Sequence, residues 1–208
     1  LAHWPTGPVR LRWVPQPKKY SEPVTAVHCF CFWGERIVLV DVAGGRGVSI
    51  PGGHILTGES LLDGLRRELA EEACITVDSP VLLGAVECDH SENPAFGPSL
   101  GYPRLASQLL YAGTVNRLLP FAAKYETSRR IFVPALKCPE QFNEWDAVMQ
   151  AAFDDALVWM AGQQVAAPDK TNKEHVMNLK SIWSALEHVY DILGGYGFPA
   201  MDKAATEM

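Results

Sequence analysis

The pattern of apolar and polar positions predicts a group of short strands. Val24–Phe32 is rich in β-branched and aromatic residues, and Ile37–Val42 has the same composition after a tight turn. The two segments therefore predict a β-hairpin, and a short strand at Val48–Ile50 follows a glycine-rich turn. Further strands are predicted at Val81–Glu87, Ala106–Val115 and Arg129–Val133.

Two stretches have the apolar spacing of amphipathic helices. In the first, leucines recur every four residues from Leu61 to Leu69, and Leu62 and Ala73 widen the apolar stripe. The second stretch, Glu144–Met160, has the same kind of spacing. We expect each helix to bury its stripe against the strands.

The remaining segments predict the organisation of the chain. Residues 1–23 contain five prolines, which exclude a helix and indicate an extended arm or an edge strand. The main domain is predicted over residues 24–161. An amphipathic helix at 172–193 must bury its apolar stripe, either on the body or in a homodimer contact. Residues 194–208 are expected to form a loosely held tail.

Composition narrows the class of function. The net charge of -6 over 208 residues gives no electrostatic footprint for a nucleic-acid polymer or an anionic membrane. The five cysteines form no CxxC pair and predict free thiols in a reducing cytoplasm. We find no signal peptide and no apolar run of about 18 residues, so a membrane span is not expected. His28 is expected to be a satisfied core or sheet-face histidine.

Acidic residues gather in the first predicted helix, after a Gly-Gly turn. Glu68, Glu71 and Glu72 border its apolar stripe, and such a cluster repels itself unless a cation lies among the carboxylates. Gly64 lies in the same arc, where its missing side chain would leave room beside the carboxylates. Oxygen donors of this kind suit Mg²⁺, Mn²⁺ or Ca²⁺ rather than zinc. On composition alone, a solvated acidic face is the alternative interpretation.

This stretch resembles the signature motif of the Nudix hydrolases. One position departs from the motif, because Cys74 stands where the family usually has glycine, at a helix end where glycine often forms the C-cap. The resemblance implies an α+β fold, an α/β/α sandwich with a mixed sheet between helices. The residues that match the motif at the correct spacing are Gly53, Glu59, Arg67, Glu68, Leu69, Glu71, Glu72 and Ile75.

The resemblance also implies a metal-dependent pyrophosphohydrolase. Its substrate would be a nucleoside diphosphate linked to another moiety, of the ADP-ribose, nucleotide-sugar or nucleoside triphosphate type, and water would attack phosphorus. The cofactor would be Mg²⁺ or Mn²⁺. The resemblance implies that Glu68, Glu71 and Glu72 are metal ligands, and that Glu68, Arg67 and Glu71 are catalytic. Arg67 would hold a box carboxylate in place, and Glu59 would have an orienting or outer-shell role. Gly53 would supply turn geometry and backbone access to the metal site.

The general base and the substrate contacts stay open at this point. Either a box glutamate or Glu126, just before the predicted strand at 129–133, is the candidate base, with Glu87 and Asp89 as rivals. Candidates for substrate contact are Arg104 and Arg129 for phosphates and Trp33 and Tyr102 for stacking on a base; the alternatives are solvent exposure for the arginines and packing for the aromatics.

Two other functions compete with hydrolysis. The main alternative is a catalytically silent Nudix-fold module that binds nucleotides or has a regulatory role. Loss of Arg67 or of the box glutamates would favour this alternative, and none of these residues is lost here. A non-hydrolytic isoprenoid diphosphate isomerase is disfavoured, because its additional histidine and cysteine pattern is not evident. For the hydrolase, the expected partner is a small-molecule nucleotide or nucleoside diphosphate derivative.

Overall fold

The computed structural model describes most of the first 166 residues. The chain divides into a compact unit at Leu1–Met160 and a second unit that begins at Ala161. The helix predicted at 172–193, the tail at 194–208 and Tyr102 lie outside the described residues. The described ranges are 2–4, 7–16, 20–21, 23–94, 103–143 and 145–166.

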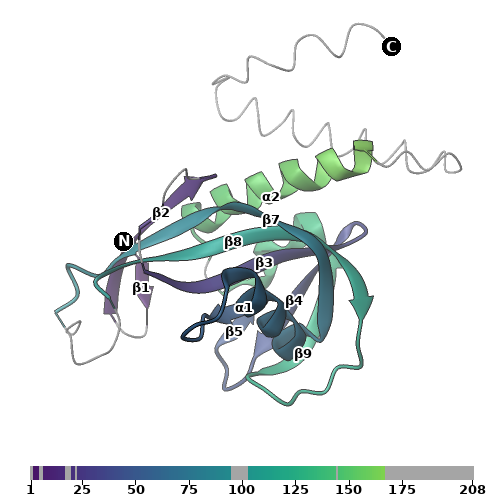
Figure 1. Cartoon of the computed structure of the whole chain (residues 1–208), viewed down its shortest axis with the longest axis horizontal. Helices are drawn as coiled ribbons and strands as arrows, with labels where there is room; N and C mark the ends of the chain where they lie inside the picture. Colours follow the sequence, from purple (N-terminus) through teal and green to yellow (C-terminus); the bar gives the residue numbers. More distant parts are fainter. Residues whose placement is uncertain are drawn as a thin grey trace, which may run out of the picture. The chain divides into compact units, whose positions relative to one another are not determined.

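A mixed sheet of nine strands forms the centre of the described residues of the first unit. Only β3 and β8 pair in parallel, and the other described strand pairs are antiparallel. Figure 1 shows the long strands β7 and β8 side by side, with β3 next to β8. The order is β1 (Ala2–Trp4), β2 (Gly7–Pro15), β7 (Ile75–Asp89), β8 (Leu105–Leu118), β3 (Val24–Trp33), β4 (Arg36–Val42) and β5 (Gly47–Ser49), while β6 (Gly52–His54) pairs with β3 and β9 (Thr127–Pro134) with β4.

The strands predicted from composition are all present. The hairpin of β3 and β4 closes at Trp33 and Arg36, which face each other in the register. β7 and β8 are longer than predicted, since they continue through irregularities near Thr76, Asp78 and Leu82 that periodicity does not reveal. The N-terminal segment contains two strands, β1 and β2, and β2 pairs with both β1 and β7.

The two faces of the sheet carry separate cores. Successive side chains of β3 point to opposite faces, so Phe30 and Phe32 enter one core while Cys29 and Cys31 enter the other. The first core includes Phe153 of α2 (Ala147–Ala166), whose ring lies 5.5 Å from that of Phe30. The second core includes leucines of the acidic helix. The two helices thus cover opposite faces of the sheet, as expected for an α+β sandwich.

The acidic helix has two parts. α1 (Leu61–Glu68) begins at Ser60, whose Oγ accepts a hydrogen bond from the backbone N–H of Asp63 at 3.2 Å. A π-helical turn, η1 (Leu69–Ala73), continues it and ends at Cys74. This turn widens the backbone, so Glu71 and Glu72 are not placed as a regular α-helix predicts.

The buried stripe of this helix is narrower than predicted. Leu65, Leu69 and Ala73 are buried at spacings of four residues. Leu62 is 39% exposed, so its expected place in the stripe is wrong. The physical reason is that Leu61 and Leu65 already face the sheet, and Leu62 lies about 100° around the helix from Leu61.

All five cysteines are free and buried, which confirms the prediction of free thiols. Within the described residues, no helix combines the length and the apolar character needed to cross a membrane.

Candidate active site

Arg67, in the last turn of α1, connects three glutamates. Its guanidinium donates to both carboxylate oxygens of Glu59 at 2.9 and 3.0 Å, to Glu68 at 2.8 Å and to Glu71 at 3.2 Å. It also donates to the backbone carbonyl of His54 at 2.8 Å. The hydrogen bonds with Glu59 raise the pKa of Arg67 far above its ordinary value, and Glu68 adds to the rise while burial opposes it. Arg67 is therefore fully committed to holding carboxylates.

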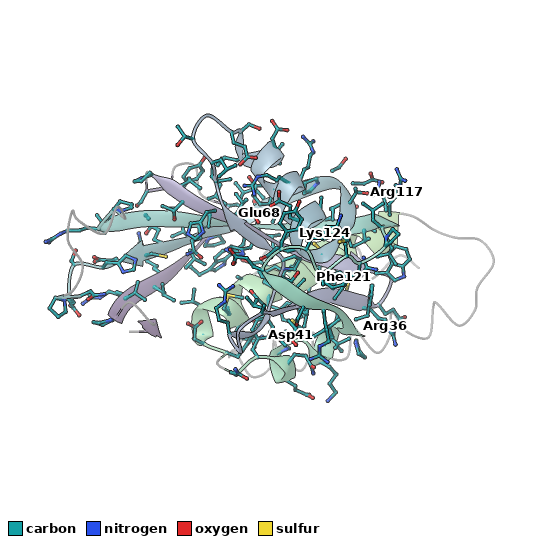
Figure 2. The ribbon with its side chains drawn as sticks, turned by 90° about the horizontal axis from the view of Figure 1, so that it is seen from below. Arg36, Asp41, Glu68, Arg117, Phe121 and Lys124 are labelled. Atoms are coloured by element: carbon teal, nitrogen blue, oxygen red, sulfur yellow. The ribbon has the colours of Figure 1, made fainter. Side chains whose placement is uncertain are left out.

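The short strand β6 receives two carboxylates from the helix. The backbone N–H of Gly52 donates to Glu72 Oε2 at 2.9 Å. A Cβ on Gly53 would lie 2.6 to 2.7 Å from the carboxylate atoms of Glu68, so only glycine leaves that carboxylate its place. Glu68 is the last residue of α1 and is labelled in Figure 2. The spacing of the motif thus brings Glu68 and Glu72 together against one Gly-Gly segment.

The environment of Glu72 disfavours its negative charge. Burial raises the pKa of Glu72 to about 7, the Gly52 N–H opposes the rise, the charges of Glu68 and Glu126 add to it, and Arg46 lowers it. A nearby cation would stabilise the ionised form of a carboxylate that is buried among like charges in this way.

Glu126 approaches the helix carboxylates from a different part of the chain. Its neighbour Thr127 is buried and donates through Oγ1 to the backbone carbonyl of Glu72 at 2.6 Å. The carbonyl of Glu126 accepts from the N–H of Ala43 at 2.7 Å, and its carboxylate accepts from Arg46 at 2.8 Å. The start of β9 is therefore fixed to the end of the acidic helix, which brings Glu126 close to Glu72.

The rival acids lie elsewhere on the sheet. Glu87, near the end of β7, accepts hydrogen bonds from Arg12 and Ser21, and these lower its pKa, with Ser21 the larger cause. Asp89 accepts from the backbone N–H of Ser91. Arg104 lies at the same end of the sheet, where its carbonyl accepts from the N–H of His90 at 2.8 Å. Among the described contacts, none links Glu87, Asp89 or Arg104 to the helix carboxylates.

Arg129 and Trp33, predicted to contact substrate, have other surroundings. Arg129 donates twice to Asp41 Oδ2, at 3.0 and 2.7 Å, and is mostly exposed. Trp33 lies in the β3–β4 hairpin beside Arg36, and Figure 2 shows Arg36 and Asp41 well separated along β4. Neither residue has a described contact with the helix carboxylates.

Arg130 closes the end of the acidic helix. Its guanidinium donates to the carbonyls of Ala73 and Cys74 at 2.9 Å and to that of Leu119 at 3.1 Å. It also lies over the rings of Phe132 and of Phe121, which is labelled in Figure 2. Arg130 thus supports the backbone at the helix end instead of facing solvent.

Comparisons with known proteins agree with this geometry. The model of the NUDIX domain family matches residues 22–178, three quarters of the chain. The chain belongs to the Nudix family. It is accordingly a Nudix hydrolase, and its acidic helix with the preceding Gly-Gly segment is the Nudix box. No curated protein matches the chain.

Solved structures show the same fold. The Bacillus subtilis pyrophosphohydrolase BsRppH is 19% identical with a TM-score of 0.58, over 73% of this chain and 91% of its own. A Nudix hydrolase from Nitrosomonas europaea is 21% identical with a TM-score of 0.50, over 68% and 90%. An Ap4A hydrolase from C. elegans is 16% identical with a TM-score of 0.50, over 67% and 99%. At these identities the likeness concerns the fold alone.

The Nudix box has the donor chemistry for a hard divalent cation. Glu68, Glu71 and Glu72 offer only oxygen atoms, and the bare backbone of Gly53 leaves Glu68 its position. In the part of the chain that the structure describes, no group of three or more His, Cys, Asp or Glu side chains is arranged to hold a metal. Arg67 donates to Glu68 and Glu71, and Glu72 accepts from the backbone N–H of Gly52. The three carboxylates therefore suit a hard divalent cation, which would bind Glu68 and Glu71 beside their hydrogen bonds with Arg67.

Two positions of the Nudix box have sharper explanations in three dimensions. A Cβ on Gly64 would lie 2.4 Å from Ile55 Cδ1 and 3.0 Å from Glu59 Oε2, so the clearance at Gly64 admits Ile55 and Glu59. Cys74 has φ 50° and ψ 50°, the left-handed conformation that glycine adopts most easily. The departure from the family motif therefore falls where a non-glycine residue is strained.

Sequence reasoning missed some residues around the site. Arg46 was not singled out, although a lone arginine in a turn with three glycines is a visible signal. His28 lies on the sheet as expected, but the expectation that it is satisfied is wrong. Its buried Nδ1 has no hydrogen-bond partner among the described residues, and a Cβ on Gly52 would lie 2.7 Å from it. Burial lowers the pKa of His28 to about 4, and the charge of His54 adds to the fall.

Proposed function

We propose that this Nudix hydrolase is a metal-dependent pyrophosphohydrolase that cleaves a nucleoside diphosphate linked to another moiety. The observation that carries the proposal is the meeting of Glu68 and Glu72 at the Gly52–Gly53 segment. A diphosphate is a polyanion, and a carboxylate cluster alone would repel it. Magnesium or manganese, held by Glu68, Glu71 and Glu72, supplies charge neutralisation and activation of water when bound.

The other Nudix box residues act on these carboxylates. Arg67 orients Glu68 and Glu71, and Glu59 holds the opposite side of the Arg67 guanidinium through two hydrogen bonds. Such a supporting contact fixes the carboxylates within the small tolerance that catalysis requires. In this account Arg67 and Glu59 are positioning residues, which act through the carboxylates of Glu68 and Glu71.

Glu126 is the proposed general base. Its carboxylate is mostly exposed, its charge raises the pKa of Glu72, and its backbone is fixed by Ala43 and Thr127. An exposed acid on a fixed backbone, next to the proposed ligands, has access to water that attacks phosphorus. The substrate contacts of Arg104, Arg129, Trp33 and Tyr102 stay predictions.

The relatives suggest which substrates to test first. BsRppH is named a pyrophosphohydrolase and the C. elegans protein an Ap4A hydrolase, and both share this fold. The five buried free thiols support a reducing compartment such as the cytoplasm, where nucleotide derivatives are the expected small molecules.

A substrate panel tests the proposal. The purified chain is incubated with ADP-ribose, nucleotide sugars, nucleoside triphosphates or dinucleoside polyphosphates, with Mg²⁺ or Mn²⁺, and release of phosphate, pyrophosphate or mononucleotide is measured. We expect turnover of at least one diphosphate-linked nucleoside and complete loss with EDTA. Turnover that persists in EDTA, or no turnover of any member with either metal, contradicts the proposal.

A further inference from the structure

The turn between β4 and β5 presents one arginine to the Nudix site. Gly44, Gly45 and Gly47 have φ of +78°, +74° and +90°, a backbone that favours glycine at each position. Arg46 is the only charged residue of the turn at 43–47. Its side chain is 59% exposed. The turn therefore carries a single cationic side chain with access to solvent.

The contacts of Arg46 connect it to the site carboxylates. Its guanidinium donates to Glu126 Oε2 at 2.8 Å, and its Nε donates to the carbonyl of Ala43 at 3.3 Å. Ala43 in turn donates to the carbonyl of Glu126 at 2.7 Å. The charge of Arg46 also lowers the pKa of Glu72. Arg46 thus stands beside both the proposed base and a proposed metal ligand.

The two arginines of the site differ in how tightly they are held. Arg67 is 24% exposed and donates to three carboxylates and a carbonyl. Arg46 has a single carboxylate partner among its described contacts, and both members of that pair are more than half exposed. Exposed ion pairs of this kind contribute little stability, so their partners exchange readily. Arg46 is therefore available to an incoming anion, whereas Arg67 is not.

We propose that Arg46 binds a phosphate of the substrate, exchanging Glu126 for a phosphate oxygen when the diphosphate enters the site. This inference rests on the proposed function and extends it to a residue outside the Nudix box. A guanidinium presents paired N–H donors that match phosphate oxygens. The exchange also frees the Glu126 carboxylate from its ion pair, so that it can accept a proton from water. The turn at 43–47 then couples binding of the phosphate to release of the Glu126 carboxylate from its ion pair.

Binding of a non-hydrolysable diphosphate tests the exchange without turnover. Methylenediphosphonate is titrated calorimetrically into the full chain in the presence of Mg²⁺. We expect Arg46→Gln to weaken its binding by about tenfold or more, the loss typical of a hydrogen bond to a charged group, and Arg46→Lys to weaken it less. The matched control is Arg66→Gln, because Arg66 is 63% exposed and also paired with one acid, Asp63. We expect binding by the control to equal that of the wild type.

Glu126→Gln separates phosphate binding from a purely structural role of Arg46. If Arg46 binds phosphate, this variant removes a competitor, and methylenediphosphonate binds equally well or up to about fivefold more tightly. If Arg46 only positions Glu126, then Arg46→Gln and Glu126→Gln weaken or preserve binding together. That result overturns the inference. Three other results also overturn it: wild-type affinity in Arg46→Gln, a loss of affinity in Arg66→Gln equal to that in Arg46→Gln, or no binding of the probe by the wild type. A different pair of results shows that only the proposed function fails. In that case the probe binds and its binding depends on Arg46, but the chain turns over no substrate of the panel.

Discussion

Replacement of Gly53 by alanine separates the position of Glu68 from the stability of the fold. The new Cβ would lie 2.6 Å from Cδ and Oε2 of Glu68, whereas ordinary van der Waals contact begins at 3.4 Å. The carboxylate must therefore retreat by about 0.8 Å. A displacement of about 1 Å in a catalytic group costs about 100-fold in rate, so we expect turnover with Mg²⁺ to fall by about that factor.

The stability of Gly53→Ala is expected to change little. The displaced atoms are the end of a flexible side chain, and the lost Arg67–Glu68 hydrogen bond, which joins two charged groups at 2.8 Å, contributes about 1.5 kcal/mol. Alanine regains about 0.5 to 1 kcal/mol over glycine in a strand. The remaining destabilisation is at most about 1 kcal/mol, and the melting temperature should stay within about 4 °C of wild type.

Steady-state kinetics and thermal unfolding are measured together on wild type, Gly53→Ala and a control. Gly162→Ala in α2 serves as the control, because its Cβ would meet no atom within 4 Å. We expect full activity in the control. Wild-type activity in Gly53→Ala, or a loss of activity explained by unfolding, would refute the link between Gly53 and the Glu68 carboxylate.

Two further predictions concern Cys74 and His28. Cys74→Gly relieves about 1 to 2 kcal/mol of left-handed backbone strain but loses the buried sulfur and the rigidity of a non-glycine residue. The free energy of unfolding from urea titration should therefore change by less than about 1 kcal/mol, with activity unchanged or improved. A large loss of activity would reveal a role for the thiol. Because the folded-state pKa of His28 is lowered to about 4, the unfolded chain binds an extra proton below its ordinary pKa of 6.5, and stability should fall as pH drops from 6.5 towards 4. His28→Gln should weaken this pH dependence in urea titrations, and an unchanged slope would be evidence against the shifted pKa.

The strands and the Nudix box were predictable because their signals are local. β-branched and aromatic runs gave β3 and β4, and the four-residue spacing of Leu65 and Leu69 gave the buried face of the helix. The fixed spacing of Gly53 and Glu68 was also sufficient to predict that they belong to one site. Where they meet, however, depends on the pairing of β6 with β3, which the sequence does not state.

The less predictable features depend on tertiary structure. The π-helical turn at Leu69–Ala73 alters the direction of Glu71 and Glu72, because a regular period of 100° per residue assumes an α-helix throughout. The closeness of Glu126 to Glu72 arises from Thr127 and its hydrogen bond across 55 residues of sequence. Arg46 was missed for the same reason, since its partner Glu126 is 80 residues away.

The central claim is that the box carboxylates carry metal-dependent hydrolysis. Turnover of the best panel substrate is measured against Mg²⁺ concentration for wild type and Glu72→Gln, with circular dichroism and thermal unfolding to establish that the fold is intact. The account predicts that Glu72→Gln lowers Mg²⁺-dependent turnover by at least about 100-fold while the fold is retained. Turnover near the wild-type level at every Mg²⁺ concentration would contradict it.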